Sequence, residues 1–273
     1  MFENKEFAMT SSDYQFIRTT VYDECGIVLG EHKKDMVYSR LARRIRALRL
    51  STFSQYIDYL KDNMDAEFGH FINSITTNLT SFFREPHHFE FLSEQALKEI
   101  KANHLMDKRV RIWSAGCSTG MEPYSIAMTM SKAIPSNWDF KILATDLDTN
   151  VLATAKEGVY EAQNVTGINK DILSEHFLHD ASGQKYRVKD SIRKLITFKQ
   201  LNLLERWPMK GPFDIIFCRN VVIYFDLETK NKLFQRYAEL LRPNGYLILG
   251  HSETMSKEVT CFHSLGKTIY QKV

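Results

Sequence analysis

The sequence predicts an α/β protein in which a small all-helical domain precedes a doubly wound sheet domain that carries a small β-hairpin insert. Apolar residues recur at helical spacing up to about residue 74, whereas from about residue 110 short apolar runs alternate with helical segments. The composition is 44% hydrophobic and 25% charged, with 12 Gly and 6 Pro among 273 residues. These values are typical of a folded globular protein with a sizeable core.

The N-terminal segment, residues 1–74, is predicted to be a helical domain. Its apolar positions are spaced as on one face of a helix, and we find no alternating strand pattern in it. Two groups of residues set this spacing: Tyr14, Ile17, Val21 and Tyr22, and then Phe53, Tyr56, Ile57 and Leu60.

Residues 75–273 are predicted to form the sheet domain. A first strand at 110–114 ends in a Gly-containing turn and is followed by a helix at 124–133 and a second strand at 141–146. The later elements are strands at 195–198, 213–218 and 246–250, a helix at 228–241, and a candidate last strand at 267–272. Alternation of this kind implies a parallel sheet with helices on both of its faces.

A small insert, at about 178–195, interrupts this alternation. The turn signals Ser182-Gly183 and Asp190-Ser191 flank a short strand-like run, Tyr186-Arg187-Val188. We expect a β-hairpin here, attached to the main sheet domain.

Composition also excludes several classes of protein. The net charge of +3 is too small to indicate nucleic-acid binding by itself. The polar start of the chain predicts no secretory signal, and the longest uncharged apolar run, 221–225, is far shorter than a membrane span, so no membrane insertion is expected. The four scattered cysteines form no C-x-x-C pair, which argues against a disulfide framework or a cysteine zinc site and favours the cytoplasm.

The ends of the first two predicted strands suggest a cofactor site. The turn at 115–123 is rich in small residues, and Asp146 ends the second strand, where doubly wound folds hold a ribose diol. The alternatives are an ordinary strand-to-helix turn and, for Asp146, a helix cap, a role that suits Asp148 at least as well. Because no phosphate-loop lysine is present, an adenosyl group without pyrophosphate, such as S-adenosylmethionine, is favoured.

A strongly basic helix is predicted between Lys33 and Arg49. It contains seven cations and one acid, and Val37, Leu41, Ile45 and Leu48 form its apolar stripe. The expected docking cations on its other faces are Arg40, Arg43, Arg44 and Arg46. Because almost no acids lie four residues away to neutralise them, we expect an acidic partner, with RNA as the alternative and a solvated charged face as the simplest explanation.

We predict no metal site. His87 and His88 are adjacent, and neighbouring side chains on a helix point about 100° apart. His176 and His179 lack a third ligand. Ser252 follows Gly250 but lacks the second Gly of a nucleophile elbow, so we expect a loop there.

Four blocks of sequence, in order, closely resemble the chemotaxis receptor methyltransferases of the CheR type. They are Asn78-Leu-Thr-Ser-Phe-Phe-Arg84-Glu-Pro-His-His-Phe89, Ser118-Thr-Gly-Met-Glu-Pro-Tyr-Ser125, Ala144-Thr-Asp-Leu-Asp148 and Phe217-Cys-Arg-Asn-Val-Val-Ile-Tyr-Phe225, and Gly250-His-Ser-Glu253 also matches. The resemblance runs over almost the whole chain. It implies a helical receptor-docking domain at 1–74 and a Rossmann-like methyltransferase domain at 75–273.

The resemblance also implies the reaction. Family members transfer a methyl group from S-adenosylmethionine to receptor glutamates, which leaves S-adenosylhomocysteine and glutamate methyl esters and serves sensory adaptation. The cofactor contacts carried over by motif are Asn78, Thr80, Arg84, Glu122, Asp146, Asn202, Leu203, Arg219 and Asn220. One departure is Met121, which stands where the family usually has the first of two acids, whereas the second, Glu122, is kept.

Arg84 and Tyr224 are the expected catalytic residues. A glutamate carboxyl has an ordinary pKa near ~4.3, so at neutral pH the nucleophile is already ionised and needs orientation more than a base. Arg offers a planar fork that matches a carboxylate, and Tyr offers a directional hydroxyl donor. The alternatives are a core aromatic for Tyr224 and a surface ion pair with Glu85 for Arg84.

The leading hypothesis is a cytoplasmic, monomeric protein-glutamate O-methyltransferase whose partner is the helical cytoplasmic domain of chemoreceptors. A nucleic-acid methyltransferase is the second hypothesis, but we see no stacking platform or base-flipping motif for nucleic acid. A silent adaptor is the third.

In the family the hairpin subdomain can bind a receptor C-terminal peptide. The loop at 180–184 has a single Gly, so we expect no dependence on such a peptide.

Overall fold

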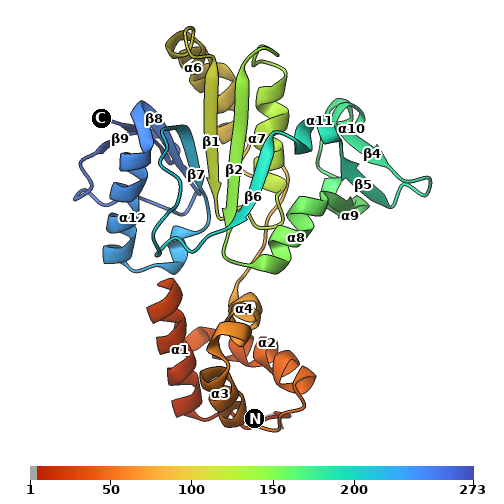
Figure 1. Cartoon of the computed structure of the whole chain (residues 1–273), viewed down its shortest axis with the longest axis vertical. Helices are drawn as coiled ribbons and strands as arrows, with labels where there is room; N and C mark the ends of the chain where they lie inside the picture. Colours follow the sequence, from red (N-terminus) through yellow and green to blue (C-terminus); the bar gives the residue numbers. More distant parts are fainter. Residues whose placement is uncertain (1–4) are drawn as a thin grey trace.

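The computed structural model describes residues 5–273, so the first four residues of the predicted helical domain lie outside the described residues. The chain forms two bodies that meet at a narrow waist, with the N-terminal helices at one end and the sheet at the other (Figure 1). Within residues 5–273, no helix is both long and apolar enough to cross a membrane.

The N-terminal body is helical, as the sequence predicts. Its helices are α1 (Ser11–Cys25), η1 (Glu31–Lys33), α2 (Lys34–Ala47), α3 (Phe53–Asp62) and α4 (Met64–Ile75). Thr10 and Asp13 cap the start of α1 reciprocally, and Gly26 ends the helix in a left-handed conformation with φ 67°. The expected stripe of α2 is buried, with Val37, Leu41 and Ile45 at 0% exposure, so this helix packs its apolar side inward.

The second body is built on a seven-stranded sheet in the order β6-β2-β1-β7-β8-β10-β9. Its strands are β1 (Arg109–Ala115), β2 (Asp139–Asp146), β6 (Ile196–Gln200), β7 (Phe213–Cys218), β8 (Leu241–Leu249), β9 (Phe262–Gly266) and β10 (Ile269–Lys272). The first five strands in this order are parallel, and the chain reverses its direction of travel across the sheet between β1 and β7. That reversal is the topological switch point of the fold.

The sheet is parallel as predicted, except at one edge. β10 pairs antiparallel with β8, and β9 pairs antiparallel with β10. The sequence analysis gave β10 as a candidate and missed β9, because in β9 Phe262 alone is buried and the strand shows no alternation. β8 also begins earlier than predicted, at Leu241.

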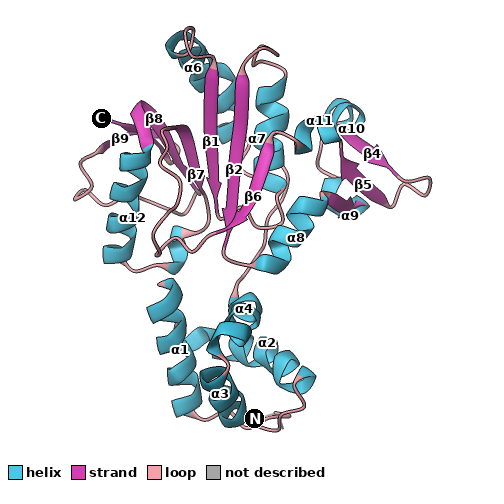
Figure 2. Cartoon of the chain, viewed as in Figure 1, coloured by secondary structure: helices cyan, strands magenta, loops and turns pink. Residues whose placement is uncertain are grey.

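Helices cover both faces of the sheet (Figure 2). They are α5 (His87–Phe91), the π-helical turn η2 (Leu92–Ala96), α6 (Leu97–Asn103), α7 (Met121–Ser131), α8 (Thr149–Glu157), η3 (Val222–Tyr224) and α12 (Leu227–Leu240). Alternation along β1 divides the core into two clusters. Ile112 packs in the cluster that contains residues of α7, and Trp113 packs in the one that contains residues of α12.

The predicted insert is present but has a third strand. β4 (Phe177–His179) and β5 (Lys185–Val188) form the hairpin, and β3 (Val159–Glu161) pairs with the other edge of β5. Three short helices accompany it: α9 (Ala162–Val165), α10 (Lys170–His176) and α11 (Asp190–Arg193). Asp190 and Ser191 therefore begin a helical turn rather than a hairpin turn. The insert projects from the side of the sheet domain (Figure 1).

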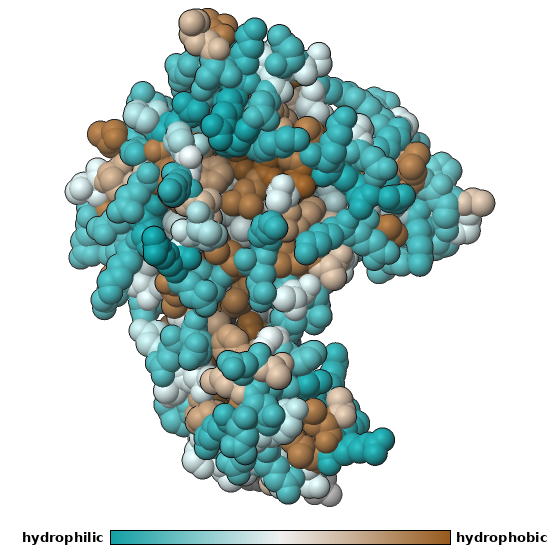
Figure 3. All heavy atoms as spheres, viewed as in Figure 1, coloured by the Kyte–Doolittle hydropathy of each residue, from teal (hydrophilic) through white to brown (hydrophobic). Residues whose placement is uncertain are grey.

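Specific hydrogen bonds join the two bodies. The Tyr22 hydroxyl donates to Asp226 Oδ2 at 2.6 Å, and the Val28 amide donates to the Tyr224 carbonyl at 2.8 Å. Tyr22 is 45% exposed, so this member of the predicted apolar repeat serves the interface rather than the helical core. Apolar atoms reach the surface at the waist, and the molecule is hollowed between the insert and the helical body (Figure 3).

Candidate active site

One cavity lies at the carboxyl ends of β1, β2 and β7, at the switch point of the sheet. The space between its walls is about 1180 Å³, open solvent at the mouth included. All ten predicted catalytic and cofactor residues line it, although they come from five separate stretches of chain: Asn78, Thr80, Arg84, Glu122, Asp146, Asn202, Leu203, Arg219, Asn220 and Tyr224.

The turn after β1 forms one wall and depends on its small residues. Gly116 has φ +89°, and a Cβ on it would collide with the side chain of Val221 from the loop after β7. Met121, the departure from the family pattern, is 5% exposed and packs in the core. Glu122 faces the cavity instead, so the substitution at Met121 leaves the lining unchanged.

Asp146 ends β2 with its carboxylate held by two backbone amides. Oδ2 accepts from the Ser118 amide at 2.7 Å, and Oδ1 accepts from the Asp148 amide at 3.0 Å. Burial nevertheless raises the pKa of Asp146 to about 6. The helix-capping role falls to Asp148, which accepts from the Asn150 and Val151 amides at the start of α8. Asp146 is therefore left at the cavity wall as a partly buried acceptor.

A buried arginine between two carboxylates forms the opposite wall. Arg219 is 5% exposed, and its two terminal nitrogens lie 3.1 Å from Glu122 Oε2 and 3.2 Å from Glu85 Oε2. Burial raises the pKa of Glu122 despite the arginine. Burial also acts to raise the pKa of Glu85, but Arg219 and the His251 amide outweigh it and hold that pKa below its usual range. The sequence analysis considered Glu85 only as a partner of Arg84.

Two of the three predicted asparagine contacts, Asn78 and Asn202, differ in their bonding. Asn78 donates to Asp148 Oδ2 at 2.8 Å, which fixes the linker between the domains against the end of β2. Asn202 donates to the Glu24 carbonyl at 2.7 Å and accepts from the Leu204 amide at 3.0 Å. Asn202 therefore ties α1 to the loop after β6, and its amide is largely committed to backbone.

Arg84 and Tyr224 both border the cavity. Arg84 Nη1 donates to the Leu79 carbonyl at 3.0 Å, and its Nε lies 3.9 Å from Glu85, at the outer limit of an ion pair. The side chain of Arg84 remains 35% exposed. Tyr224 is only partly buried, so it is not the core aromatic weighed as the alternative. Lys33 Nζ lies 4.9 Å from the centroid of its ring.

The helical domain supplies a further part of the lining that the sequence analysis missed. Cys25, Ile27, Leu29, Lys33 and Met36 all border the cavity. No motif marks these residues, because they reach the site only through the packing of one domain on the other. The site therefore lies between the two domains rather than in the sheet domain alone.

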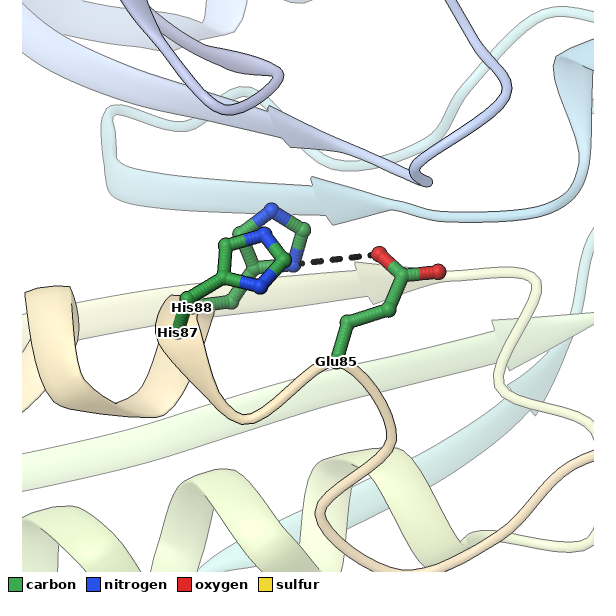
Figure 4. A group of neighbouring side chains, drawn as sticks. All are labelled: Glu85, His87 and His88. Atoms are coloured by element: carbon green, nitrogen blue, oxygen red, sulfur yellow. Dashed lines mark ion pairs between the residues drawn. The ribbon is translucent and has the colours of Figure 1, made fainter.

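The expectation that the side chains of His87 and His88 diverge is wrong. Their ring centroids are 4.1 Å apart, and with Glu85 they place three candidate ligand atoms within 4.8 Å of one another (Figure 4). His88 lies 3.5 Å from Glu85, and burial, with Arg219 nearby, lowers its pKa to about 4. Because Glu85 already balances the charge of Arg219, a metal ion here would face a buried guanidinium at close range.

Three of the four predicted docking arginines have partners inside the protein, and those of Arg40 and Arg44 give these two residues a structural role in the helical domain. Arg40 donates to the carbonyls of Ile75 and Thr76, and Arg44 forms a two-pronged pair with Glu67, which is 1% exposed. These partners were invisible in the local sequence, because they belong to α4 and the linker. Arg46 pairs with the exposed Glu6, and Arg43 has no ion pair within residues 5–273.

Comparison with known proteins covers nearly all of the chain. Residues 12–76 match the family model described as CheR methyltransferase, all-alpha domain, and residues 78–271 match CheR methyltransferase, SAM binding domain. The chain is 43% identical to chemotaxis protein methyltransferase 2 of Pseudomonas aeruginosa, over 99% of this chain and 96% of that protein. It is 41% identical to the chemotaxis protein methyltransferase of Salmonella typhimurium, over 97% of this chain and 92% of that protein.

Likeness to solved structures is much weaker. PKMT2 from Rickettsia typhi in complex with AdoHcy aligns with a TM-score of 0.37 and 15% identity, over 64% of this chain and 26% of that chain. A likeness of this size has no bearing on the site.

Proposed function

This chain belongs to the CheR methyltransferase family, and we propose that the cavity between its two domains is the active site. The protein is an S-adenosylmethionine-dependent methyltransferase that forms methyl esters on chemoreceptor glutamates in adaptation. The observation that supports the location best is the convergence of ten motif residues from five stretches of chain on one cavity.

The chemistry of the lining fits S-adenosylmethionine. Asp146 offers a partly buried carboxylate to a ribose diol, and Glu122 offers another to an ammonium group. Leu147, Leu201 and Leu203 supply apolar surface for a purine. When bound, the cofactor supplies an electrophilic methyl group on a sulfonium.

The protein's own residues then orient the acceptor. The glutamate carboxylate is ionised at neutral pH and needs no general base, so the site requires donors that hold it in line with the methyl group. We assign this role to the Arg84 guanidinium and the Tyr224 hydroxyl, both at the cavity wall. Lys33 adds a positive charge beside the Tyr224 ring, which favours entry of an anionic side chain.

We assign receptor docking chiefly to Arg43 and Arg46. Arg43 is exposed and unpaired within the described residues, and Arg46 is held only by the exposed Glu6, a contact that an acidic receptor surface can replace. The partner in this proposal is the helical cytoplasmic domain of the receptor. The proposal places a monomeric enzyme in the cytoplasm and gives it no role on nucleic acid.

Methyl transfer from tritiated S-adenosylmethionine to receptor-containing membranes tests this function. Label that is released by mild alkali identifies a carboxyl ester and supports the proposal. Alkali-stable label on nucleic acid would contradict it. Calorimetry that detects no cofactor binding at all would instead favour a silent adaptor.

A further inference from the structure

Glu253, in the loop after β8, is a buried carboxylate to which the sequence analysis gave no role. It is 2% exposed, and within residues 5–273 it forms no ion pair with a cationic side chain. A buried charge without a counter-ion is costly unless dipoles replace the lost water. The contacts of Glu253 show which dipoles these are.

Four backbone amides donate to the two oxygens of Glu253. Oε2 accepts from the Gly250 amide at 2.6 Å and from the Asn220 amide at 2.8 Å. Oε1 accepts from the Val221 amide at 2.8 Å and from the Ile223 amide at 3.2 Å. Three of these four donors belong to the segment after β7, so one side chain holds three backbone amides of that segment.

The same segment carries residues assigned to the reaction. Arg219 and Asn220 begin it, and Tyr224 ends its helical turn η3, with all three lining the cavity. Asn220 has φ +58°, a left-handed conformation that costs free energy in a residue other than glycine. Hydrogen bonds to Glu253 on both sides of this strained position, at 220 and 221, compensate that cost.

The loop after β8 packs so closely on the loop after β7 that a side chain at Gly250 would collide with it. A Cβ on Gly250 would lie 2.7 Å from Asn220 Nδ2 and 2.8 Å from Glu253 Oε2. Glycine at 250 thus lets the loop after β8 lie directly against the loop after β7. Both loops are held at the carboxyl ends of neighbouring parallel strands.

We infer that Glu253 is a positioning residue for methyl transfer, which fixes the segment 219–224 and thereby sets the placement of Tyr224 in the cavity. This inference rests on the proposed function of the cavity. Glu253 itself does not line the cavity, so it acts through the residues that it holds.

The central test is Glu253→Gln in the full chain, compared with Tyr224→Phe and with the double variant. The glutamine keeps the size of the side chain but turns an NH₂ group toward amide donors. We expect kcat to fall about tenfold to a hundredfold, the range for a misplaced reacting group. If Glu253 acts through Tyr224, the double variant loses little beyond the worse single variant, whereas a general structural defect multiplies the two losses.

Three further variants complete the design. Glu253→Asp, which keeps the charge, should recover part of kcat, and it replaces the glutamine variant if that protein does not fold. Gly250→Ala displaces the same loop without changing charge and should reproduce the loss. Glu258→Gln, an exposed acid on the same loop, is the matched control and should behave as wild type.

The outcomes separate the inference from the proposed function. Wild-type protein that transfers methyl groups, together with a folded Glu253→Gln variant of normal kcat, overturns the role of Glu253 alone. Multiplicative losses in the double variant also overturn it. Wild-type protein that transfers no methyl group to receptors contradicts the proposed function instead.

Discussion

At the scale of single residues, burial and backbone dipoles together set the charge of Asp146. The carboxylate is held by the Ser118 and Asp148 amides, yet burial raises its pKa to about 6. A carboxyl whose pKa is higher in the folded protein stabilises the fold below its ordinary pKa. That contribution is lost as the pH rises through about 6. Affinity for a ribose diol should change with pH in the opposite direction and rise as the pH rises, because the ionised carboxylate is the better hydrogen-bond acceptor.

We therefore predict that cofactor affinity falls in acid. At pH 5 the dissociation constant should be about tenfold higher than at pH 7.5, because most Asp146 is then protonated. Asp146→Asn should weaken binding by about 1.5–3 kcal/mol per charge-assisted bond and lose this pH dependence. Calorimetric titrations of both proteins across this range measure the effect. An unchanged affinity in the asparagine variant would refute the ribose assignment.

Arg84→Lys tests the fork that is assigned to the substrate carboxylate. An ammonium keeps the charge but cannot form two parallel hydrogen bonds, so we expect turnover at saturating receptor to fall about tenfold or more. Arg187→Lys, an exposed change in the insert, is the matched control. Near-normal turnover of the Arg84 variant would remove this residue from the carboxylate-holding role.

At the scale of elements, α2 divides its cations between two tasks. Arg44 balances the buried Glu67, and Arg40 closes the carboxyl end of α4, so both stabilise the helical domain. Arg43 and Arg46 lie on exposed positions of the same helix and remain available to a partner. A mutation in the first pair would disturb the fold and say nothing about docking.

Reversal of charge at Arg43 and Arg46 should raise the apparent KM for receptor and leave cofactor affinity unchanged. The effect should shrink with added salt, because exposed charges are screened over about 8 Å at physiological ionic strength. Lys61→Glu, on α3 of the same domain, is the charge-matched control for each single reversal. A parallel loss of cofactor affinity would mean that these two arginines are structural as well.

The hairpin insert is the second element that bears on recognition. A peptide that adds a strand must pair with an edge, and the edges of the small sheet are β3 and β4, because β5 lies in the middle. The Asp180–Gln184 loop is closed on itself, with Asp180 Oδ1 accepting from the Gln184 and Lys185 amides. A tight loop offers little surface for a peptide.

We predict that this enzyme does not depend on a receptor C-terminal peptide. Calorimetric titration with C-terminal peptides of its own receptors should show no micromolar binding. Leu178 is 54% exposed on the edge strand β4, so a substitution there tests whether any peptide binding that is detected occurs at this edge. Micromolar affinity that Leu178→Asp abolishes would show that the short loop was misinterpreted.

At the scale of the whole molecule, the two domains meet at the residue assigned to catalysis. The Val28 amide binds the Tyr224 carbonyl, and Lys33 lies against the Tyr224 ring. A cation beside an aromatic face is worth about 1 kcal/mol when partly shielded. The helical domain thus shapes the site, in addition to the receptor docking that we propose for it.

Lys33→Met should lower kcat/KM for receptor about fivefold, in line with the loss of one such contact, while cofactor affinity stays within twofold. Lys34→Met is a matched control, because the Lys34 ammonium lies over Tyr14, outside the cavity lining. Steady-state methylation with both variants measures the difference. Equal effects of the two changes would argue for general electrostatics rather than a specific contact.

Much of the site could be predicted because motifs in an α/β fold are local. Each group of site residues lies at the carboxyl end of a strand with a clear apolar pattern: the turn after β1, Asp146 as the last residue of β2, and Arg219-Asn220 after β7. Parallel strands bring their carboxyl ends to one edge, so residues at these ends must converge. The convergence of all ten residues on one cavity follows from this rule together with the family motifs.

The sequence by itself determined the helical and sheet domains, the basic helix, the insert and the residues at the strand ends, because each depends on periodicity or on a contiguous motif. Only the tertiary structure decided the antiparallel edge, the partners of Arg40 and Arg44, the part of the helical domain in the cavity and the four amides on Glu253. These features depend on contacts between segments far apart in the chain. A local sequence pattern does not specify which distant segments contact each other, because these contacts form only when the whole chain packs.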